Sequence, residues 1–377
     1  MPDRPLRVLE LFQPPAGGVP VYVAHLARGL TSRGHHVVVA GPPNAAIRGE
    51  IEDAGVRYLP LAIFPELRPR QDLRLLRRLV ALLRTGNFDA MHAHAQKAGL
   101  VGRLAGMIAR VPVLYTANCF TYRTQLLKAR PSARVRYVAA KAMERLLGRI
   151  AGGIIAVADE ERQAALDDRL ARPERVHLVL TGVEVEPDVQ PDPALVAFRG
   201  EGPLFGFVAT LRDQKGLPVL LDALELLAAR GGAPRVAIVG NGPLWGEVQQ
   251  RLAAGSLGQT TLLVPFEDRS EPYLAALDAL VLPSLWEGLP LAVLEAMFLG
   301  VPVVATAVGG TPEAVRHERT GLIVPPGDAL ALADAMARMA VDPDLRERMG
   351  SAARQEAEQR FTVDRMVRET EAVLVGL

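Results

Sequence analysis

Two glutamates, Glu287 and Glu295, lie in the segment Pro283–Met297, PSLWEGLPLAVLEAM, which carries the clearest chemical signal in the chain. The preceding apolar run predicts a strand ending near Glu287, and Pro290 suits the first position of a helix holding Glu295 about a turn inside. The amides and positive end of such a helix favour an anionic or hydroxyl-rich ligand, and carboxylates accept hydrogen bonds from vicinal hydroxyls. Spacing alone leaves a second interpretation open, in which one acid caps the helix and the other faces solvent.

His92 and His94 alternate with alanine in the segment MHAHA, which predicts the end of a strand. Side chains two residues apart on a strand share a face, and His94 would emerge at the carboxyl end, where parallel sheets bind ligands. A histidine on a strand is also commonly a structural residue. We therefore treat His94 as a candidate site residue and His92 as a structural one.

Short apolar runs alternate with amphipathic helical stretches along the chain. In the first half, the runs that predict strands are Arg7–Phe12, His36–Ala40, Ala90–His92, Val111–Tyr115 and Gly153–Val157. Helical segments such as Val19–Arg33, Asp72–Arg84 and Lys97–Ala109 separate them. Strand, helix and strand at this spacing predict βαβ units and a parallel, doubly wound sheet.

Residues 184–203 interrupt this pattern, because they are rich in proline and acidic residues and predict a linker. Further strands are predicted at Leu204–Val208, Arg235–Gly240, Thr261–Val264, Ala279–Leu282 and Pro302–Thr306. We therefore expect two Rossmann-like α/β domains, residues 1–183 and 204–360, and a C-terminal helix over residues 361–377 that packs back on the first domain. Such sheets bind ligands at the carboxyl ends of their strands, so two facing domains would hold the active site in the cleft between them.

The composition is that of a globular protein with ample core, since 49% of the 377 residues are hydrophobic and 23% are charged. Cys119 is the only cysteine, which argues against a disulfide framework or a thiolate metal cluster. The first residues lack the apolar region of a signal peptide, and no apolar run approaches the roughly 20 residues of a transmembrane helix. We therefore expect a cytoplasmic protein.

Charge is divided unevenly along the chain. Residues 1–180 carry 27 Lys and Arg against 15 Asp and Glu, a net charge of +12, whereas residues 181–377 carry 16 against 27, a net charge of −11. One interpretation is simple drift between two domains. The other is that the first half faces an anionic partner, such as a membrane surface or a phosphorylated acceptor, and we expect no nucleic-acid partner.

Between Phe120 and Ile150, eight basic residues surround a single acid, Glu144. The basic residues are Arg123, Lys128, Arg130, Arg134, Arg136, Lys141, Arg145 and Arg149. Apolar residues recur there at helical spacing, namely Val135, Val138, Ala139, Ala142, Leu146 and Leu147. Such a helix either packs its apolar face on the first domain or lies against anionic lipid headgroups, peripherally on the inner face of the cell membrane.

Several segments resemble, in order, those of the family 4 retaining glycosyltransferases, the glycosyl transferases group 1, which have the GT-B fold. PSLWEGLPLAVLEAM followed by GVPVVATAVGGTPEAV resembles their donor-site signature, with its pair of glutamates separated by seven residues. GGVPVYVAHLARGLTSRGHHV resembles their glycine loop and first helix, and MHAHAQKAGLVGRLAGMIARVPVLYT resembles a middle strand, helix and strand. IVGNGPL, LDALVLPS, TGLIVPPGD and RFTVDRM match later blocks, so the resemblance covers nearly the whole chain.

This resemblance implies a metal-independent glycosyltransferase without a cofactor. It would move a hexose-type sugar, with retention, from a nucleotide-diphosphate sugar to a hydroxyl acceptor, and UDP-sugars are favoured over GDP-sugars. The acceptor side would be the first domain and the donor side the second. A lipid-linked acceptor in cell-surface polysaccharide or glycolipid synthesis would agree with the basic first half.

The resemblance also implies roles for individual residues on the donor side. Glu295 would bind the ribose hydroxyls, and Glu287 would contact the donor sugar as a catalytic residue. Lys215 would neutralise the departing diphosphate, with help from Arg212. The remaining donor-binding residues would be Gly288, Leu289, Pro290 and Leu291, beside sugar and phosphate, and Pro265 and Phe266, beside the nucleobase.

On the acceptor side, the resemblance places His94 near the sugar or acceptor as a catalytic residue. Gly17 and Gly18 would let the first loop approach the acceptor or a phosphate, because only glycine allows such closeness. Asn118 would belong to the same acceptor or phosphate loop region.

Four departures from the family pattern are evident. Thr210 stands where many relatives have an arginine, which weakens the expected grip on phosphate unless Arg212 compensates. The other departures are Asn118-Cys119 for a common His-Gly, Ala158 for a common serine and Thr181 for a common asparagine. Because Lys215, Glu287 and Glu295 remain, we expect altered subsites and not a dead enzyme.

Three other classes of protein were weighed against this one. A nicotinamide dehydrogenase is disfavoured because Gly240–Gly246 has the pattern GxGxxxG, and the strand Thr261–Val264 ends without the acid that would hold a ribose. A nucleotide-sugar 2-epimerase shares the architecture and would turn over donor without an acceptor. A degenerate glycosyltransferase-like binding module would have no reason to keep both glutamates and the lysine.

Overall fold

The computed structural model describes residues 4–64, 66–120, 122–123, 131–186, 188–267 and 269–377. They form two compact units, the first made of Met1–Gly182 and Val363–Leu377 and the second of Val183–Thr362, so the chain passes between the units twice. Within the described part of the chain, no helix is both long and apolar enough to cross a membrane.

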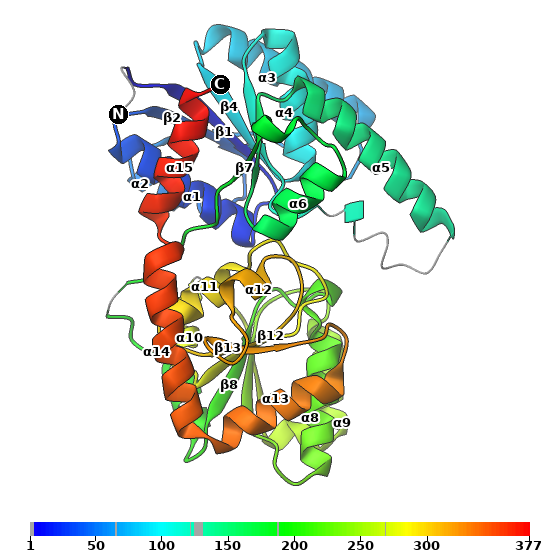
Figure 1. Ribbon diagram of the computed structural model, residues 1–377, viewed down its shortest axis with the longest axis vertical. Helices are drawn as coiled ribbons and strands as arrows, with labels where there is room; N and C mark the ends of the chain where they lie inside the picture. Colours follow the sequence, from blue (N-terminus) through cyan, green and yellow to red (C-terminus); the bar gives the residue numbers. More distant parts are fainter. Residues whose placement is uncertain (1–3, 65, 121, 124–130, 187, 268) are drawn as a thin grey trace. The chain divides into compact units, whose positions relative to one another are not determined.

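The first unit is built on a parallel sheet with the strand order β3-β2-β1-β4-β5-β6-β7 (Figure 1). Its strands are β1 (Arg7–Phe12), β2 (His36–Gly41), β3 (Arg57–Pro60), β4 (Ala90–His94), β5 (Val113–Thr116), β6 (Gly153–Ala156) and β7 (Val176–Leu178). The central strands are buried along almost their whole length, as the near-continuous apolar runs of a parallel sheet covered on both faces require. β1 pairs on one side with β2, the next strand along the chain, and on the other side with β4. The topological switch point therefore lies between β1 and β4.

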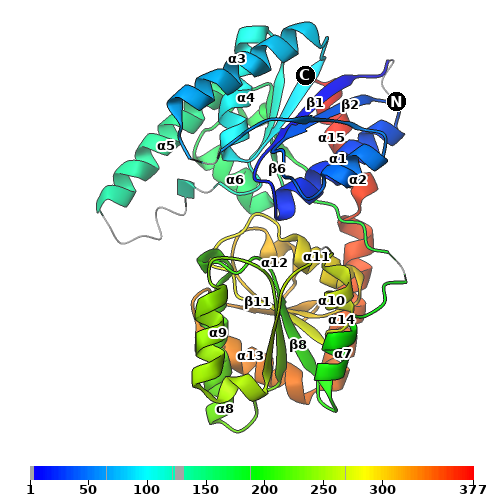
Figure 2. The same cartoon turned by 180° about the vertical axis from the view of Figure 1, so that it is seen from behind.

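Helices cover both faces of this sheet. They are α1 (Gly18–Ser32), α2 (Arg48–Asp53), α3 (Pro69–Thr85), α4 (Gln96–Ala109), α5 (Pro131–Ile150), α6 (Asp159–Asp167), the 3-10 turn η2 (Pro173–Arg175) and α15 (Val363–Val375). In both views α3, α4 and α5 lie on one side of the sheet, and α1, α2 and α15 lie on the other (Figures 1 and 2). The α3–α4 side covers an apolar core that includes Leu79, Met91 and Val101.

Helix α15 belongs to the first unit although it ends the chain. Glu371 on α15 accepts a hydrogen bond from Arg33 Nε at 2.7 Å, and its other carboxylate oxygen lies 2.7 Å from His35 Nε2. Val367 packs so tightly against α1 that a Cβ atom at Gly29 would lie 2.3 Å from it. The expected C-terminal helix over residues 361–377 therefore starts at Val363 and packs on α1.

The second unit contains a parallel sheet with the strand order β10-β9-β8-β11-β12-β13 (Figure 2). Its strands are β8 (Leu204–Val208), β9 (Arg235–Val239), β10 (Thr261–Val264), β11 (Ala279–Leu282), β12 (Val303–Thr306) and β13 (Gly321–Val324). Strand β8 continues to β9 on one side and pairs with β11 on the other, which places the switch point between β8 and β11.

The helices of the second unit complete the doubly wound arrangement. They are α7 (Pro193–Arg199), η3 (Asp213–Lys215), α8 (Leu217–Ala229), α9 (Trp245–Ala254), η4 (Ser256–Gln259), α10 (Glu271–Ala275), α11 (Leu291–Phe298), α12 (Thr311–Ala314), α13 (Ala329–Val341) and α14 (Pro343–Arg360). Residues 184–203, expected as a linker, include α7 and belong to this unit. Two Rossmann-like units with parallel sheets confirm the predicted fold class.

Candidate active site

The switch point of the second sheet brings together two residues that are far apart in the sequence. Lys215 lies in η3, after the carboxyl end of β8, and Glu287 lies in the loop that follows β11. β8 and β11 are neighbours in the sheet, and ligands of doubly wound sheets bind outside such a point. Glu287 lies in this loop, five residues beyond the last residue of β11. The expectation that a strand ends near Glu287 is therefore wrong.

Lys215, Glu287 and Ser284 form one hydrogen-bonded group. Lys215 Nζ lies 2.5 Å from Glu287 Oε1, and Ser284 Oγ donates to the same oxygen at 2.7 Å. The Glu287 side chain is 6% exposed and the Lys215 side chain 18%, so the cation is the more accessible partner. An ammonium has three donors, so Lys215 can bind an anionic group such as a phosphate as well as the carboxylate.

Backbone contacts lock the loops that carry this pair. Gln214 accepts a hydrogen bond from the Leu285 amide at 2.7 Å, and its side chain donates to the Trp286 carbonyl at 3.1 Å. Gly216 has a φ of 66°, and a Cβ atom there would lie 1.8 Å from the Pro283 carbonyl oxygen. Only glycine fits this close approach, so the loop after β8 holds the loop after β11 in place.

A third loop supports Glu287 from the side of β12. Gly309 has a φ of 52°, and a Cβ atom there would lie 2.3 Å from the Glu287 carbonyl oxygen. The Gly310 amide donates to the Gly288 carbonyl at 2.6 Å. Thr306 Oγ1, at the end of β12, donates to the Ser284 carbonyl at 2.5 Å, so the backbone on both sides of Glu287 is fixed.

Glu295 is the fifth residue of α11, which begins at Leu291 and has Pro290 as its N-cap. Pro290 thus precedes the first helical position that the sequence suggested for it. Glu295 is buried, and Ser270 Oγ donates to its Oε2 at 2.6 Å. Burial raises the pKa of the Glu295 carboxyl to about 7, the nearby Glu271 adds to this, and Ser270 and Arg269 oppose it.

The residues expected near a nucleobase lie just beyond β10. Pro265 is exposed and Phe266 is partly buried, with its ring 6.0 Å from that of Tyr273. Asn241 Nδ2, in the glycine-rich turn after β9, donates to the Phe266 carbonyl at 2.6 Å. Arg212 is exposed and has no ion-pair partner among the residues that the structure describes, so its side chain is available to a ligand.

In the first unit, His94 lies deeper than the sequence suggested. His92 and His94 are both fully buried, and their ring centroids are 3.9 Å apart with the ring planes tilted by 47°. His92 Nε2 lies 2.7 Å from Thr116 Oγ1, and His94 Nε2 lies 2.6 Å from Glu10 Oε2. His94 is the last residue of β4, at the carboxyl end where the sequence placed it, but its side chain is buried and does not emerge there.

Glu10 is a partner of His94 that sequence reasoning missed. The only signal was an acid inside the otherwise apolar strand RVLELF. Burial alone would raise the pKa of Glu10, but the charge and hydrogen bonds of His92 and His94 outweigh it and lower this pKa to about 2. Burial and the charge of His92 lower the pKa of His94 to about 4, against the opposing effect of Glu10.

Glu10, His92 and His94 also form the one group of potential metal ligands found in the described part of the chain. One donor atom from each residue lies within 4.8 Å of the others. Glu10 Oε2 is 2.6 Å from His94 Nε2, which is a hydrogen-bond distance. The cluster is thus a buried charged network beneath the switch point of the first sheet.

The glycines expected at the loop after β1 have the required freedom. Gly17 precedes α1 with a φ of 96°, and a Cβ atom there would meet nothing within 4 Å. Gly18 begins α1, and both residues are exposed. Asn118 follows β5 with a φ of 58°, and its buried Nδ2 has no hydrogen-bond partner.

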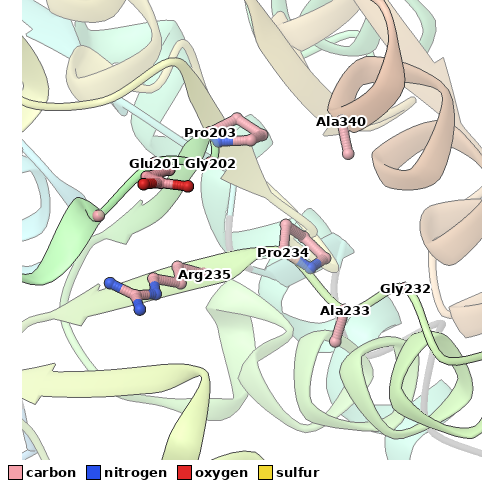
Figure 3. Close-up of a pocket in the computed structure, with 9 residues that line it drawn as sticks. Glu201, Gly202, Pro203, Gly232, Ala233, Pro234, Arg235 and Ala340 are labelled. Carbon is pink, nitrogen blue, oxygen red and sulfur yellow. The ribbon is translucent and has the colours of Figure 1, made fainter.

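A hollow of about 570 Å³ in the second unit lies away from these residues (Figure 3). It is lined by residues of two loops, which include Glu201, Pro203, Gly232 and Arg235, and by Ala340 at the end of α13. Because β8 starts at Leu204 and β9 at Arg235, this hollow lies at the amino edge of the sheet. Lys215 and Glu287 lie at the opposite, carboxyl edge.

Solved structures with the same two-unit architecture identify the class of fold. The chain matches Anabaena HepE, crystallised in complex with UDP and glucose, with a TM-score of 0.82 at 22% identity over 99% of this chain and 100% of that chain. It matches WaaG, a glycosyltransferase involved in lipopolysaccharide biosynthesis, with a TM-score of 0.71 at 18% identity over 97% and 98% of the two chains. The protein has the GT-B fold.

Sequence comparison identifies the family. The profile of the glycosyl transferases group 1 matches residues 202–342, and that of the glycosyl transferase 4-like domain matches residues 17–182. The D-inositol 3-phosphate glycosyltransferase of Kribbella flavida is 30% identical over 94% of this chain and 92% of its own length. The chain belongs to the group 1 family of glycosyltransferases.

A second kind of relative acts on a different acceptor. The UDP-Gal:alpha-D-GlcNAc-diphosphoundecaprenol alpha-1,3-galactosyltransferase of Escherichia coli is 26% identical over 72% of this chain and 71% of its own length. The D-inositol 3-phosphate glycosyltransferase of Jonesia denitrificans is 29% identical over 95% and 91%. The family membership therefore fixes glycosyl transfer, and relatives of similar identity differ in their acceptors.

Proposed function

We propose that this chain transfers a hexosyl group, with retention of configuration, from a UDP-sugar to a hydroxyl group of a lipid-linked acceptor. The observation that carries the proposal is the Lys215–Glu287 pair at the switch point of the second sheet, with Glu295 on the following helix. In this proposal Lys215 would bind the diphosphate, Glu287 beside it would bind hydroxyls of the sugar, and Glu295 would bind those of the ribose.

The Lys215 ammonium would bind the diphosphate and stabilise its departure, because it is the partly exposed member of a charged pair. Exposed Arg212, three positions earlier, would supply the positive charge that Thr210 does not. When Lys215 turns to the phosphate, Glu287 is released to accept hydrogen bonds from the donor sugar. No metal ion is required in this scheme, since the cationic side chains take the role that a divalent metal has elsewhere.

On the ribose side, Glu295 would accept hydrogen bonds from the two vicinal hydroxyls, with Ser270 holding one of its oxygens. Pro265 and the Phe266 ring, which is tilted against Tyr273, would border the base. Retention requires the acceptor hydroxyl to attack from the face that the diphosphate leaves. Glu287, still held by Ser284 after Lys215 has turned to the phosphate, serves as an electrostatic partner of the sugar in this proposal and not as a covalent nucleophile.

Names of relatives support the donor and the acceptor. The Escherichia coli relative is named for a UDP-galactose donor and a diphosphoundecaprenol-linked acceptor, and HepE was crystallised with UDP-glucose as well as with UDP. The inositol 3-phosphate relatives favour a second candidate acceptor, a small phosphorylated cyclitol. We favour the lipid-linked acceptor, in cell-surface polysaccharide synthesis on the cytoplasmic face of the membrane, because the outer face of helix α5 is both apolar and cationic.

Nucleotide binding is tested first, by thermal unfolding with UDP and with GDP, since a ligand of the native state raises the unfolding temperature. Turnover is then followed with UDP-hexoses, a polyprenyl-diphosphate sugar and inositol 3-phosphate as acceptors, in the presence of EDTA. We expect stabilisation by UDP, transfer to the lipid-linked sugar and an axial anomeric product by proton NMR. Stabilisation by GDP alone, an inverted product, or donor epimerisation without an acceptor would each overturn the corresponding part of the proposal.

A further inference from the structure

Helix α5 exposes a stripe of apolar side chains to solvent. Val135 is 70% exposed, Val138 59% and Leu146 61%, and Ala139 and Ala142 between them are exposed as well. Each of these five residues, here called the α5 stripe, has another member three or four positions away, so they share one face of the helix. The stripe is about three turns long and has no apolar partner on its outer side in the described part of the chain.

A different face of α5 attaches the helix to the first unit. Glu144 is buried and accepts from Arg103 at 2.8 Å, and Leu147 is only 3% exposed. Tyr137 and Ala140 pack on the core around Tyr115 and Ile154. The expectation that the apolar residues of this helix pack on the first domain is therefore confirmed for Leu147. It is wrong for the α5 stripe, which points away from the domain.

Cations border the stripe on both sides. At about 100° per residue, Arg134 and Arg136 lie roughly a quarter turn to either side of Val135, and Arg149 follows one turn after Leu146. All three arginines are exposed and have no ion-pair partner among the described residues. The only acid of the helix, Glu144, is buried against Arg103, so the outer face of α5 is apolar and cationic without a negative charge.

The neighbouring helix α3 adds a second row of cations. Arg70, Arg74, Arg77 and Arg78 are exposed on it, and none has an ion-pair partner within the described ranges. Helix α3 packs on α4, and α4 packs on α5, so the three helices form one layer on the same side of the sheet (Figures 1 and 2). The outer surface of this layer thus combines a row of arginines with the α5 stripe.

We propose that the outer surface of the α3–α4–α5 layer binds an anionic lipid membrane, with the α5 stripe inserted at the boundary of headgroups and acyl chains. An apolar stripe between arginines is the arrangement of helices that lie flat in this boundary, where the long side chains reach up to lipid phosphates. The purpose of this contact rests on the proposed function, because it would bring the enzyme to a lipid-linked acceptor. The binding itself does not depend on catalysis.

A second copy of the chain is the main competing occupant of the stripe. In a symmetric dimer, the stripe of one copy would face the stripe of the other, and Arg134, Arg136 and Arg149 would meet the same arginines. Such like charges repel one another, whereas a surface of lipid phosphates complements them. The charge pattern therefore favours the membrane. Lys128 and Arg130, which precede α5, lie outside the described residues.

The test is sedimentation of the full chain with vesicles of phosphatidylcholine alone and of phosphatidylcholine mixed equally with phosphatidylglycerol. We expect binding to the anionic vesicles only, weakened by salt. Replacing Arg74, Arg77 and Arg78 by glutamine should weaken it about fivefold for each arginine. The variant Val135→Ser, Val138→Ser, Leu146→Ser should weaken it about tenfold or more. The matched control is Val196→Ser, Leu330→Ser, Val341→Ser, on exposed apolar residues of the second unit, which should bind like the unchanged protein.

Binding of neither vesicle, or equal binding of both, overturns the proposal. So does a dimer of the unchanged protein that the α5 stripe variant dissociates in size-exclusion chromatography with light scattering. UDP stabilisation of every variant is measured in parallel, because it reports the donor site of the second unit alone. Intact UDP binding without vesicle binding would reject the membrane surface, and with it the reason to favour a lipid-linked acceptor, but would keep the proposed UDP-sugar donor site. The reverse result would reject the donor assignment only.

Discussion

At the scale of single residues, Lys215 and Glu287 neutralise each other at the place where a diphosphate would bind. The ammonium and the carboxylate are 2.5 Å apart, and Ser284 holds the same carboxylate oxygen. In the proposed mechanism a donor phosphate draws Lys215 away from Glu287, so the two anionic groups compete for the ammonium. This competition means that the affinity for the nucleotide and the rate of transfer respond differently to a change at Glu287.

We expect Glu287→Gln to lower kcat about 10- to 100-fold while the unfolding temperature stays within a degree or two. The charged acceptor for sugar hydroxyls is lost, and a hydrogen bond to a charged group contributes about 1.5–3 kcal/mol. UDP should bind at least as tightly as before, because Lys215 is no longer neutralised. Steady-state kinetics and UDP titration measure both effects, and Glu201→Gln, an exposed glutamate at the amino edge of the same sheet, is the control. Unchanged kcat would remove Glu287 from the mechanism.

Glu295 should make both stability and donor affinity depend on pH near neutrality. Its carboxyl has a folded-state pKa of about 7, above the usual value, so the native state binds more protons than the unfolded state between roughly pH 4.5 and 7. Stability from this group is therefore present at low pH and is lost as pH rises through 7, by on the order of 3 kcal/mol. The lowered pKa of His94 has the opposite effect on stability at pH values below the usual histidine pKa. The contribution of Glu295 must therefore be measured against a variant that lacks its carboxyl group.

The measurement is the difference in unfolding free energy between the unchanged protein and Glu295→Gln from pH 5 to pH 8. We expect the unfolding free energy of the variant to increase relative to that of the unchanged protein as pH rises, because glutamine carries no buried charge. UDP affinity of the unchanged protein should rise over the same range, since the ionised carboxylate is the better acceptor for the ribose hydroxyls, and Glu295→Ala should bind UDP weakly at every pH. A difference that stays constant with pH would show that Glu295 does not titrate there.

His94 can be separated from its structural role by a conservative change. Removing it completely would leave the Glu10 carboxylate buried with one partner fewer, which costs about 3–5 kcal/mol for a broken buried pair. Glutamine at position 94 keeps a hydrogen-bond donor toward Glu10, so His94→Gln should remain folded and bind UDP normally. If the imidazole acts on the acceptor side, transfer should nevertheless fall about tenfold or more. Full transfer activity in this variant would make His94 a structural residue only.

At the scale of elements, the central strands were predictable and several edge strands were not. The predicted segments Arg7–Phe12, Leu204–Val208 and Ala279–Leu282 coincide with β1, β8 and β11, because strands buried on both faces form continuous apolar runs. The missed strands β3, β7 and β13 all lie at sheet edges and have three or four residues each. Such short segments have no period that distinguishes them from loops.

The candidate site was predictable only where one segment carries it. Glu287 and Glu295 share a short stretch of sequence, and the family resemblance added Lys215. Ser284 was missed although it lies only three positions before Glu287. Ser270 and Glu10 were missed because Ser270 is 25 positions from its partner Glu295 and Glu10 is 84 from its partner His94. Contacts of that separation depend on the order of strands in the sheet, which local spacing does not specify.

The interlocked loops around Glu287 should tolerate no side chain at Gly216. Alanine there would combine a φ of 66° with a Cβ atom 1.8 Å from the Pro283 carbonyl oxygen, so the loop after β11 must move. We expect Gly216→Ala to lower stability by at least about 1 kcal/mol and to weaken UDP binding. The control is Gly246→Ala in the first turn of α9, where a Cβ atom meets nothing within 4 Å and helix propensity favours alanine. Equal behaviour of the two variants would show that the loops are not coupled.

At the scale of the whole molecule, the two units have separate cores and opposite charges, so a ligand of one need not stabilise the other. The first unit holds most of the basic residues of the chain, and the candidate donor residues all lie in the second. Both tryptophans, Trp245 and Trp286, belong to the second unit as well, and Trp286 directly precedes Glu287. Tryptophan fluorescence therefore reports on the second unit alone, while far-ultraviolet circular dichroism reports on both units.

We expect UDP to raise the unfolding midpoint measured by tryptophan fluorescence, in EDTA as well as in magnesium. At a UDP concentration 100 times its dissociation constant, the gain in stability of the second unit should be about 2.7 kcal/mol. Circular dichroism should show an unfolding transition whose midpoint rises with UDP. If the two units unfold independently, it should also show a second transition whose midpoint does not depend on UDP. Lys215→Ala should greatly reduce the shift, because it leaves only Arg212 of the two cations proposed to bind the diphosphate. A shift that appears only with magnesium would contradict the metal-independent grip on phosphate, and a shift confined to the circular dichroism signal would move the nucleotide site to the first unit.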